Sequence, residues 1–103
     1  MTAPVTIQLC IEVAAAEFGV SLRTILYSDR TPLASAPRQI AMWLAHCLTT
    51  KSHAQIGRAL AGRDGSTVRH GIRKIEEMRA GDVAFMARTD RLRESLKTTE
   101  KAA

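Results

Sequence analysis

The chain of 103 residues, 46% of them hydrophobic, is long enough for one compact domain spanning residues 1–103 and leaves no room for a second. Its formal net charge of +5, with the basic excess between residues 36 and 81, favours a polyanionic partner, although such a charge is also ordinary for solubility. Because it has neither an apolar run of about 18 residues nor a secretion signal, we expect a cytoplasmic protein with no membrane partner.

The first part of the chain predicts two helices followed by a loop. Apolar residues recur at spacings of three and four over Thr6–Phe18, and the glycine that follows is expected to end this helix. Ser21 is the expected N-cap of a short helix, Leu22–Tyr27. The segment Ser28–Ala36 is predicted to be a polar loop because Pro32 breaks its regularity.

The next helix has the strongest periodicity and is predicted to be the central one. It is expected to open at Pro37, a tolerated first-turn position. Its apolar face consists of Ile40, Trp43, Leu44, Cys47 and Leu48. Trp43 is therefore expected in the core rather than stacked on a base, and Cys10 and Cys47 are both interpreted as small core residues. Met42 lies off this face, where it either packs against another helix or joins an exposed apolar patch.

The middle of the chain predicts a helix-turn-helix. Ser52 caps a shorter helix, Ala61–Arg63 forms a tight turn, and Asp64 caps a longer helix. That helix turns Val68, Ile72 and Ile75 inward. Two helices joined by a short turn that contains glycine are typical of a DNA-binding unit, with the second as recognition helix.

Beyond this unit, Gly81 is expected to end the recognition helix and Asp82 to cap a final helix over about 82–97. Residues 98–103 are expected to fray. Strand signals are absent throughout the sequence. The predicted fold is therefore an all-α, compact helical domain of five to six helices with a helix-turn-helix, whose core spans about residues 6–80.

The recognition helix carries hydrogen-bonding and cationic groups opposite its apolar face. Ser66, Arg69, His70 and Arg73 form this groove-facing set. At the electropositive start of the helix, Arg63, Ser66 and Thr67 surround a position where phosphates bind well. On the central helix, Arg38 lies roughly opposite the apolar face, so its guanidinium is expected to leave the core and to be able to enter a minor groove. The same arginines also fit a solvated face.

At this point the sequence resembles a known family. APRQIAMWLAHCLT and IGRALAGRDGSTVRHGIRKIEE, from Ala36 to Glu77, resemble the C-terminal DNA-binding domain of the bacterial replication initiator DnaA, and VAAAEFGVSLRTIL resembles the opening helices of that domain. The resemblance implies double-stranded DNA binding at a DnaA-box-like sequence and a role in replication initiation. Because the chain lacks a G-x-x-x-x-G-K-[ST] phosphate loop, the resemblance implies a stand-alone binding domain without ATP chemistry.

The resemblance also assigns the DNA-binding residues by position. They are Arg38 as the minor-groove arginine, the recognition-helix entry at Arg63, Asp64, Gly65, Ser66 and Thr67, and the start of the preceding helix at Lys51 and Ser52. To these the groove-facing cations Arg69 and Arg73 are added. Gly65 departs from the family, which usually has a base-contacting histidine there, so one base contact is expected to be lost.

Other departures concern the loop and the neighbouring helix. Where the family has several cations, the loop offers only Arg30 beside Asp29, which weakens the expected attraction to the DNA backbone. Ala54 replaces a proline and His53 an apolar residue. Arg69 stands where the family is usually apolar, so specificity is expected to shift rather than vanish.

The alternative function is a replication-regulatory protein that binds the initiator or its regulator instead of DNA. Gly65 and the cation-poor loop motivate it. No catalytic set is found, because nothing converges on the adjacent Glu76 and Glu77. His46, His53 and His70 lack acidic partners at ligand spacing. We therefore expect no enzyme activity, metal, cofactor or small-molecule substrate.

Overall fold

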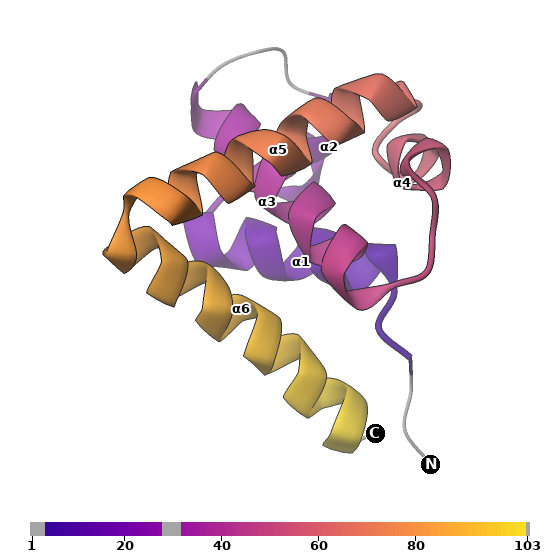
Figure 1. The fold of residues 1–103 in the computed structure, drawn as a ribbon. Helices are drawn as coiled ribbons and strands as arrows, with labels where there is room; N and C mark the ends of the chain where they lie inside the picture. The colour runs from indigo at the N-terminus through magenta and orange to yellow at the C-terminus, as the bar shows by residue number, and fades with distance from the viewer. Residues whose placement is uncertain (1–3, 28–31, 103) are drawn as a thin grey trace.

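The computed structural model describes residues 4–27 and 32–102, without the side chains of residues 32–34 and 98–102. In these residues the chain forms helices and no strand, as predicted. The helices are α1 (Ile7–Phe18), α2 (Leu22–Tyr27), α3 (Pro32–Leu48), α4 (His53–Ala59), α5 (Gly65–Gly81) and α6 (Val83–Ala102). In Figure 1, α3 runs through the middle of the molecule, α1 and α5 lie on either side of it, and α6 folds back from the end of α5.

The helix ends follow local capping chemistry. The Oγ1 atom of Thr6 accepts a hydrogen bond from Leu9 N at 3.1 Å, and Ser21 Oγ accepts one from Thr24 N at 3.0 Å. Gly19 ends α1 in the left-handed conformation, with φ of 64°. These contacts confirm the predicted boundaries of the first two helices, because short polar side chains satisfy the free N–H groups of a first turn.

The start of α3 corrects the sequence analysis. The helix begins at Pro32, so the predicted start at Pro37 and the predicted loop over residues 32–36 are wrong. Proline at the first helical position removes an N–H that has no partner in the helix anyway, so Pro32 begins the helix instead of breaking it. Pro37 lies inside the helix with its ring fully buried. Residues 28–31, which include Asp29 and Arg30, lie outside the described residues.

The core is centred on α3. Its buried side chains include Ile40, Trp43 and Leu44, which confirms that Trp43 is a core residue. Met42 is buried at 1% exposure and packs beneath α5 at Gly71. Of the two predicted alternatives, it therefore packs against another helix and does not form an exposed apolar patch. Gly71 allows this approach because a Cβ there would lie 2.6 Å from the sulfur of Met42.

The two cysteines differ. Cys10 is fully buried in α1, as expected, but Cys47 is exposed, which corrects the prediction that both are core residues. Cys47 lies near the C-terminal end of α3, where helical periodicity gives the direction of a side chain but not whether another element covers it.

The final helix is longer than predicted and is fixed to the rest of the domain by arginines. Asp82 Oδ1 accepts a hydrogen bond from Phe85 N at 3.1 Å, which confirms its capping role, but α6 continues to Ala102 instead of fraying after about residue 97. Arg79 pairs with Asp90 at 2.9 Å and stacks over Trp43.

Among the described residues, no helix is long and apolar enough to cross a membrane.

Candidate nucleic-acid interface

The helix-turn-helix is held together by a tight connection between α4 and α5. The N–H of Arg63 donates to the carbonyl of Gly57 at 2.7 Å, so the turn lies directly on α4. A Cβ at Gly57 would lie 2.0 Å from the carbonyl oxygen of Arg63, so only glycine fits there. Ala61 and Gly62 reverse the chain with φ values of 61° and 77°. This geometry fixes where α5 begins relative to α4.

Both helices of this unit are capped as predicted. Ser52 Oγ accepts from Gln55 N at 3.2 Å, while the Gln55 side chain accepts from Ser52 N at 2.8 Å, which forms a capping box at the start of α4. The Asp64 carboxylate accepts from Ser66 N at 3.2 Å at the start of α5. Lys51 and Ser52 are exposed beside this region.

One face of α5 is buried and the opposite face is open to solvent. Val68, Ile72 and Ile75 are buried, as predicted. The residues expected to face DNA, Ser66, Thr67, Arg69, His70 and Arg73, are all exposed. Four of them, Ser66, Arg69, His70 and Arg73, surround a surface hollow of about 230 Å³, which we call the α5 hollow. The groove-facing set predicted from helical periodicity therefore lies together on one surface.

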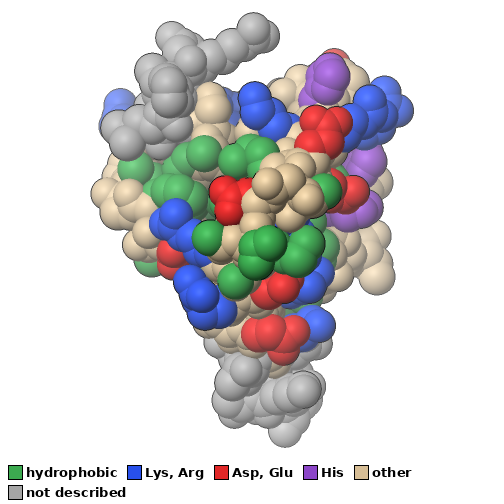
Figure 2. Space-filling model, turned by 60° about the vertical axis from the view of Figure 1, so that its left-hand side comes forward, with side chains coloured by type: hydrophobic (Ala, Val, Ile, Leu, Met, Phe, Trp, Pro, Cys, Tyr) green, Lys and Arg blue, Asp and Glu red, His purple; other side chains and the backbone are tan. Residues whose placement is uncertain are grey.

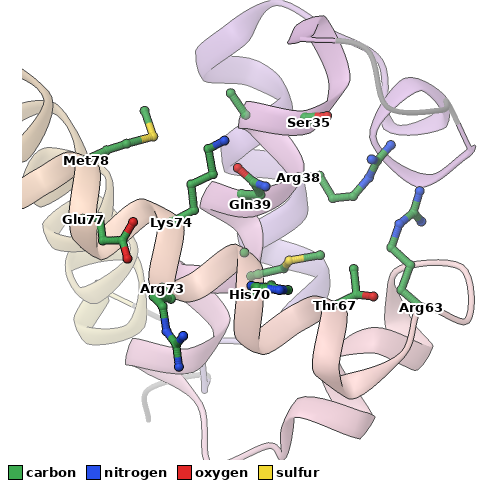
Figure 3. Close-up of a pocket in the computed structure, with 13 residues that line it drawn as sticks. Ser35, Arg38, Gln39, Arg63, Thr67, His70, Arg73, Lys74, Glu77 and Met78 are labelled. Atoms are coloured by element: carbon green, nitrogen blue, oxygen red, sulfur yellow. The ribbon is translucent and has the colours of Figure 1, made fainter.

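A second, larger depression runs between α3 and α5 (Figure 3). This α3–α5 groove has a volume of about 1470 Å³. Arg38 and Arg63 lie toward one end of it, and Lys74 and Met78 lie toward the other. Thr67, His70 and Arg73 also line the groove. Three arginines predicted to bind DNA, Arg38, Arg63 and Arg73, thus border one continuous surface.

Arg38 corrects one prediction. Its side chain does not leave the core, because the residue is only 7% exposed and its Nε atom donates to the carbonyl of Ile25 at 2.7 Å. The neighbouring Arg63 donates through Nη1 to Leu26 O at 2.7 Å and to Leu60 O at 2.6 Å. Arg38 therefore holds the end of α2 against α3, and Arg63 holds it against the helix-turn-helix, while both add positive charge to the groove.

Other cations of the predicted interface have no partner within the protein. Arg69 and Arg73 make no side-chain hydrogen bond or ion pair among the described residues, and the same holds for Lys51 and Lys74. In contrast, Arg79, Arg88 and Arg93 on the α5–α6 side pair with carboxylates. An unpaired cation keeps its full charge available to an external anion. The accessible positive charge of the interface therefore lies mainly on α5, with Lys51 before α4.

The sequence reasoning missed part of the groove lining. Lys74, Gln39 and Ser35 line the α3–α5 groove but were not among the predicted site residues. Lys74 follows Thr67 by seven residues on α5, and this helical spacing is a signal that identifies it. Gln39 and Ser35 were not identifiable in this way, because their contribution depends on how α3 packs against α5.

Gly65 occupies the first position of α5 and is partly buried against α4. A Cβ at this position would lie 3.3 Å from the backbone nitrogen of Ala54 and 3.5 Å from the carbonyl carbon of His53.

The ring centroids of His53 and His46 lie 5.6 Å apart. Among the described residues, no group of three or more His, Cys, Asp or Glu side chains is placed to hold a metal ion.

The junction of α5 and α6, next to one end of the α3–α5 groove, has a more apolar surface. Figure 2 shows a face on which hydrophobic side chains gather among interspersed acidic and basic ones. At the junction of α5 and α6, Met78, Val83 and Met86 are exposed, with Val83 at 87%. Charges of both signs make this side less suited than the outer face of α5 to bind a polyanion.

The fold and the outer face of α5 define a helix-turn-helix domain of the type that places its second helix against DNA. The comparison with protein families agrees. Residues 7–75 match the family described as the bacterial DnaA protein helix-turn-helix, and the chain belongs to this family.

Individual relatives give the same result. The chain is 43% identical over 84 residues to the chromosomal replication initiator protein DnaA of Bradyrhizobium sp. (strain ORS 278), covering 82% of this chain and 18% of that protein. It is 42% identical over 81 residues to the DnaA protein of Caulobacter vibrioides (strain NA1000 / CB15N), covering 79% of this chain and 16% of the relative. The chain thus spans less than a fifth of the length of these relatives.

A solved structure has the same fold. The match is to a crystal structure of a DNA replication initiation factor, with a TM-score of 0.81 and 28% sequence identity. It covers 91% of this chain and 29% of the other. The resemblance noted in the sequence therefore extends to the arrangement of the helices.

Proposed function

We propose that this domain binds double-stranded DNA at a DnaA-box-like sequence and acts in the control of replication initiation. The observation that carries this proposal is the outer face of α5, where Arg69 and Arg73 are exposed and unpaired beside Ser66 and His70. A major groove admits one α-helix, and the N-terminal residues of a recognition helix meet the base edges. The start of α5 is the part of the chain best placed to enter it.

In this proposal the α3–α5 groove follows one DNA strand. Lys74 and Gln39 approach phosphates from the two walls of the groove, and Thr67 does so from the first turn of α5. Lys51 and Ser52 contact the backbone from the start of α4, and Asp64 keeps its capping role. Arg38 and Arg63 act chiefly as positioning residues, because their guanidinium groups already bond to carbonyls of the protein.

The affinity is expected to come mainly from phosphate contacts. If about four phosphates are neutralised, the slope of log affinity against log salt concentration is about −3.6. Specificity depends on fewer groups, because Gly65 has no side chain to contact a base. We therefore expect the affinity to change more with salt concentration than with the DNA sequence.

A fluorescence anisotropy titration tests this proposal. The full chain is titrated into a DnaA-box duplex and a scrambled duplex at two salt concentrations. We expect salt-dependent binding to both and tighter binding to the box duplex. Absence of binding to either duplex at low salt contradicts the proposal.

A second candidate function rests on the apolar corner at the α5–α6 junction. Met78, Val83 and Met86 are large hydrophobic side chains exposed near one another in the sequence, and such groups suit a protein partner. The partner in this case is the initiator or a regulator of it. Weak, sequence-independent association with duplexes in the titration favours this candidate over box recognition.

A further inference from the structure

Two residues with very short side chains, Gly65 and Ala54, meet where α5 begins. Gly65 has no side chain, and the neighbouring residue on α4 is Ala54, whose backbone nitrogen lies 3.3 Å from the position of a Cβ at Gly65. Nothing longer than a methyl group projects from these two positions. A contact with a base at this point of the interface therefore needs a side chain from elsewhere on the helix.

Helical periodicity places Arg69 within reach of this position. It follows Gly65 by four residues, so both lie on the same side of α5, one turn apart. Helical side chains point toward the N-terminus and cover the turn that precedes their own Cα. One turn rises about 5.4 Å, a distance that an extended arginine side chain spans. An arginine at position 69 can therefore extend its guanidinium toward the position where Gly65 has no side chain.

The protein makes no internal use of Arg69. The residue is exposed and has no hydrogen-bond or ion-pair partner among the described residues. Its neighbour one turn further on is Arg73, a like charge at a spacing that slightly destabilises a helix. The carboxylate of Asp64, at the same end of the helix, is engaged with Ser66 N. Arg69 therefore adds charge to the α5 hollow at a small cost in stability.

We propose that Arg69 is the specificity-determining residue of this domain and that it recognises a guanine in the major groove. Guanine presents two acceptors there, N7 and O6, and the forked guanidinium of arginine bonds to both. This inference rests on the proposed DNA-binding function. It assigns to Arg69 the base contact that position 65 cannot make.

Arg73 is assigned to the backbone by the same geometry. Base contacts come from the N-terminal part of a recognition helix, and Arg73 lies one turn further from that end than Arg69. Arg73 lines both the α5 hollow and the α3–α5 groove, which is proposed to follow a DNA strand. It is consequently the matched control, since it has the same charge, helix and exposure but a different partner.

The test is a selection from randomised duplexes with the full chain, followed by competition titrations with Arg69→Ala, Arg69→Lys and Arg73→Ala. We expect the wild type to select a sequence with a fixed guanine. Arg69→Ala and Arg69→Lys reduce the preference for that guanine about tenfold or more, and Arg69→Lys keeps the salt slope. Arg73→Ala weakens binding to all duplexes alike and keeps the guanine. Replacing the guanine by 7-deazaguanine, which lacks the N7 acceptor, weakens wild-type binding and leaves Arg69→Ala unchanged.

The outcomes separate this inference from the proposed function. If the wild type binds a selected sequence but Arg69→Ala selects the same one, and its salt slope falls by about 0.9, then Arg69 contacts a phosphate and the inference is wrong. If the wild type binds no duplex at all, the proposed function itself fails, and the inference with it. Thermal unfolding of each variant checks that these exposed positions leave the fold intact.

Discussion

Arg38 and Arg63 donate hydrogen bonds to the carbonyl oxygens of two consecutive residues, Ile25 and Leu26. These carbonyls belong to the last turn of α2, where backbone acceptors lack partners within the helix. Two cations from separate elements, α3 and the turn before α5, thus satisfy the end of one short helix. The arrangement links the first half of the domain to the helix-turn-helix.

The first prediction concerns these two arginines. Arg38→Ala and Arg63→Ala are each expected to lower the free energy of unfolding by about 1–3 kcal/mol, because Arg38 donates to one backbone carbonyl and Arg63 to two, and each variant leaves these acceptors without a charged donor. Each also weakens DNA binding several-fold, since the groove loses charge and its support. Urea denaturation and anisotropy measure the two effects. Arg58→Ala, on the exposed side of α4, is the control with almost no change in stability. A variant of Arg38 or Arg63 with wild-type stability contradicts the positioning role.

Gly57 gives a prediction about the turn. Gly57→Ala places a Cβ 2.0 Å from the carbonyl oxygen of Arg63, a backbone atom that cannot move without disturbing the turn. We expect a loss of about 1–3 kcal/mol or more in the free energy of unfolding. Gly81→Ala is the matched control, because a Cβ there meets nothing within 4 Å and alanine has the higher helix propensity. Equal stability of the two variants, measured by urea denaturation, refutes this account of the turn.

The sequence was most informative where chemistry is local. Side chains at Ser52 and Asp64 cap the backbone within three residues, and the spacing of Val68 and Ile72 determines the buried face of α5, so these features were predictable. Features that depend on how separate helices pack together were not predictable from the sequence. The position of Arg38 on its own helix predicts an outward side chain. The sequence does not show that α2 packs there, where the carbonyl of Ile25 accepts a hydrogen bond from Arg38.

The candidate site divides in the same way. The α5 hollow is built from one helix, and helical periodicity identifies its lining in advance. The α3–α5 groove needs the relative placement of two helices, so the contributions of Gln39 and Ser35 emerged only from the structure. The start of α3 was missed because Pro32 was interpreted as a helix breaker, although a first helical position tolerates proline.

Gly65 gives a prediction about specificity. Gly65→His is expected to raise the preference for a DnaA-box duplex over a scrambled one about tenfold, because a base contact contributes about 1–3 kcal/mol. Gly65→Ala is the control, since it adds the Cβ near Ala54 without an imidazole. Anisotropy competition measures the ratio. Equal affinities of Gly65→His for the two duplexes rule out a base contact from this position.

The last prediction concerns alkaline stability. Burial raises the pKa of the Cys10 thiol from 9.0 to about 12. The folded state therefore holds this proton more tightly than the unfolded state does. Its contribution to stability is fully present below about pH 9 and is lost as the pH rises toward about 12. The loss approaches about 1.4 kcal/mol per pH unit, since one unit of pKa corresponds to that free energy.

Urea denaturation of the wild type and of Cys10→Ala at several pH values isolates the effect of this thiol on the free energy of unfolding. Cys10→Ala is less stable at neutral pH because its methyl group leaves a small cavity, so the slope with pH is the quantity compared. Between about pH 9 and about pH 11 the wild type is expected to lose about 2 kcal/mol more than the variant. Cys47→Ala is the control: burial also raises the pKa of Cys47, but the residue is exposed, so most of the alkaline loss remains. If the free energy of unfolding changes with pH equally in the wild type and in Cys10→Ala, ionisation of the Cys10 thiol does not cause the alkaline loss of stability.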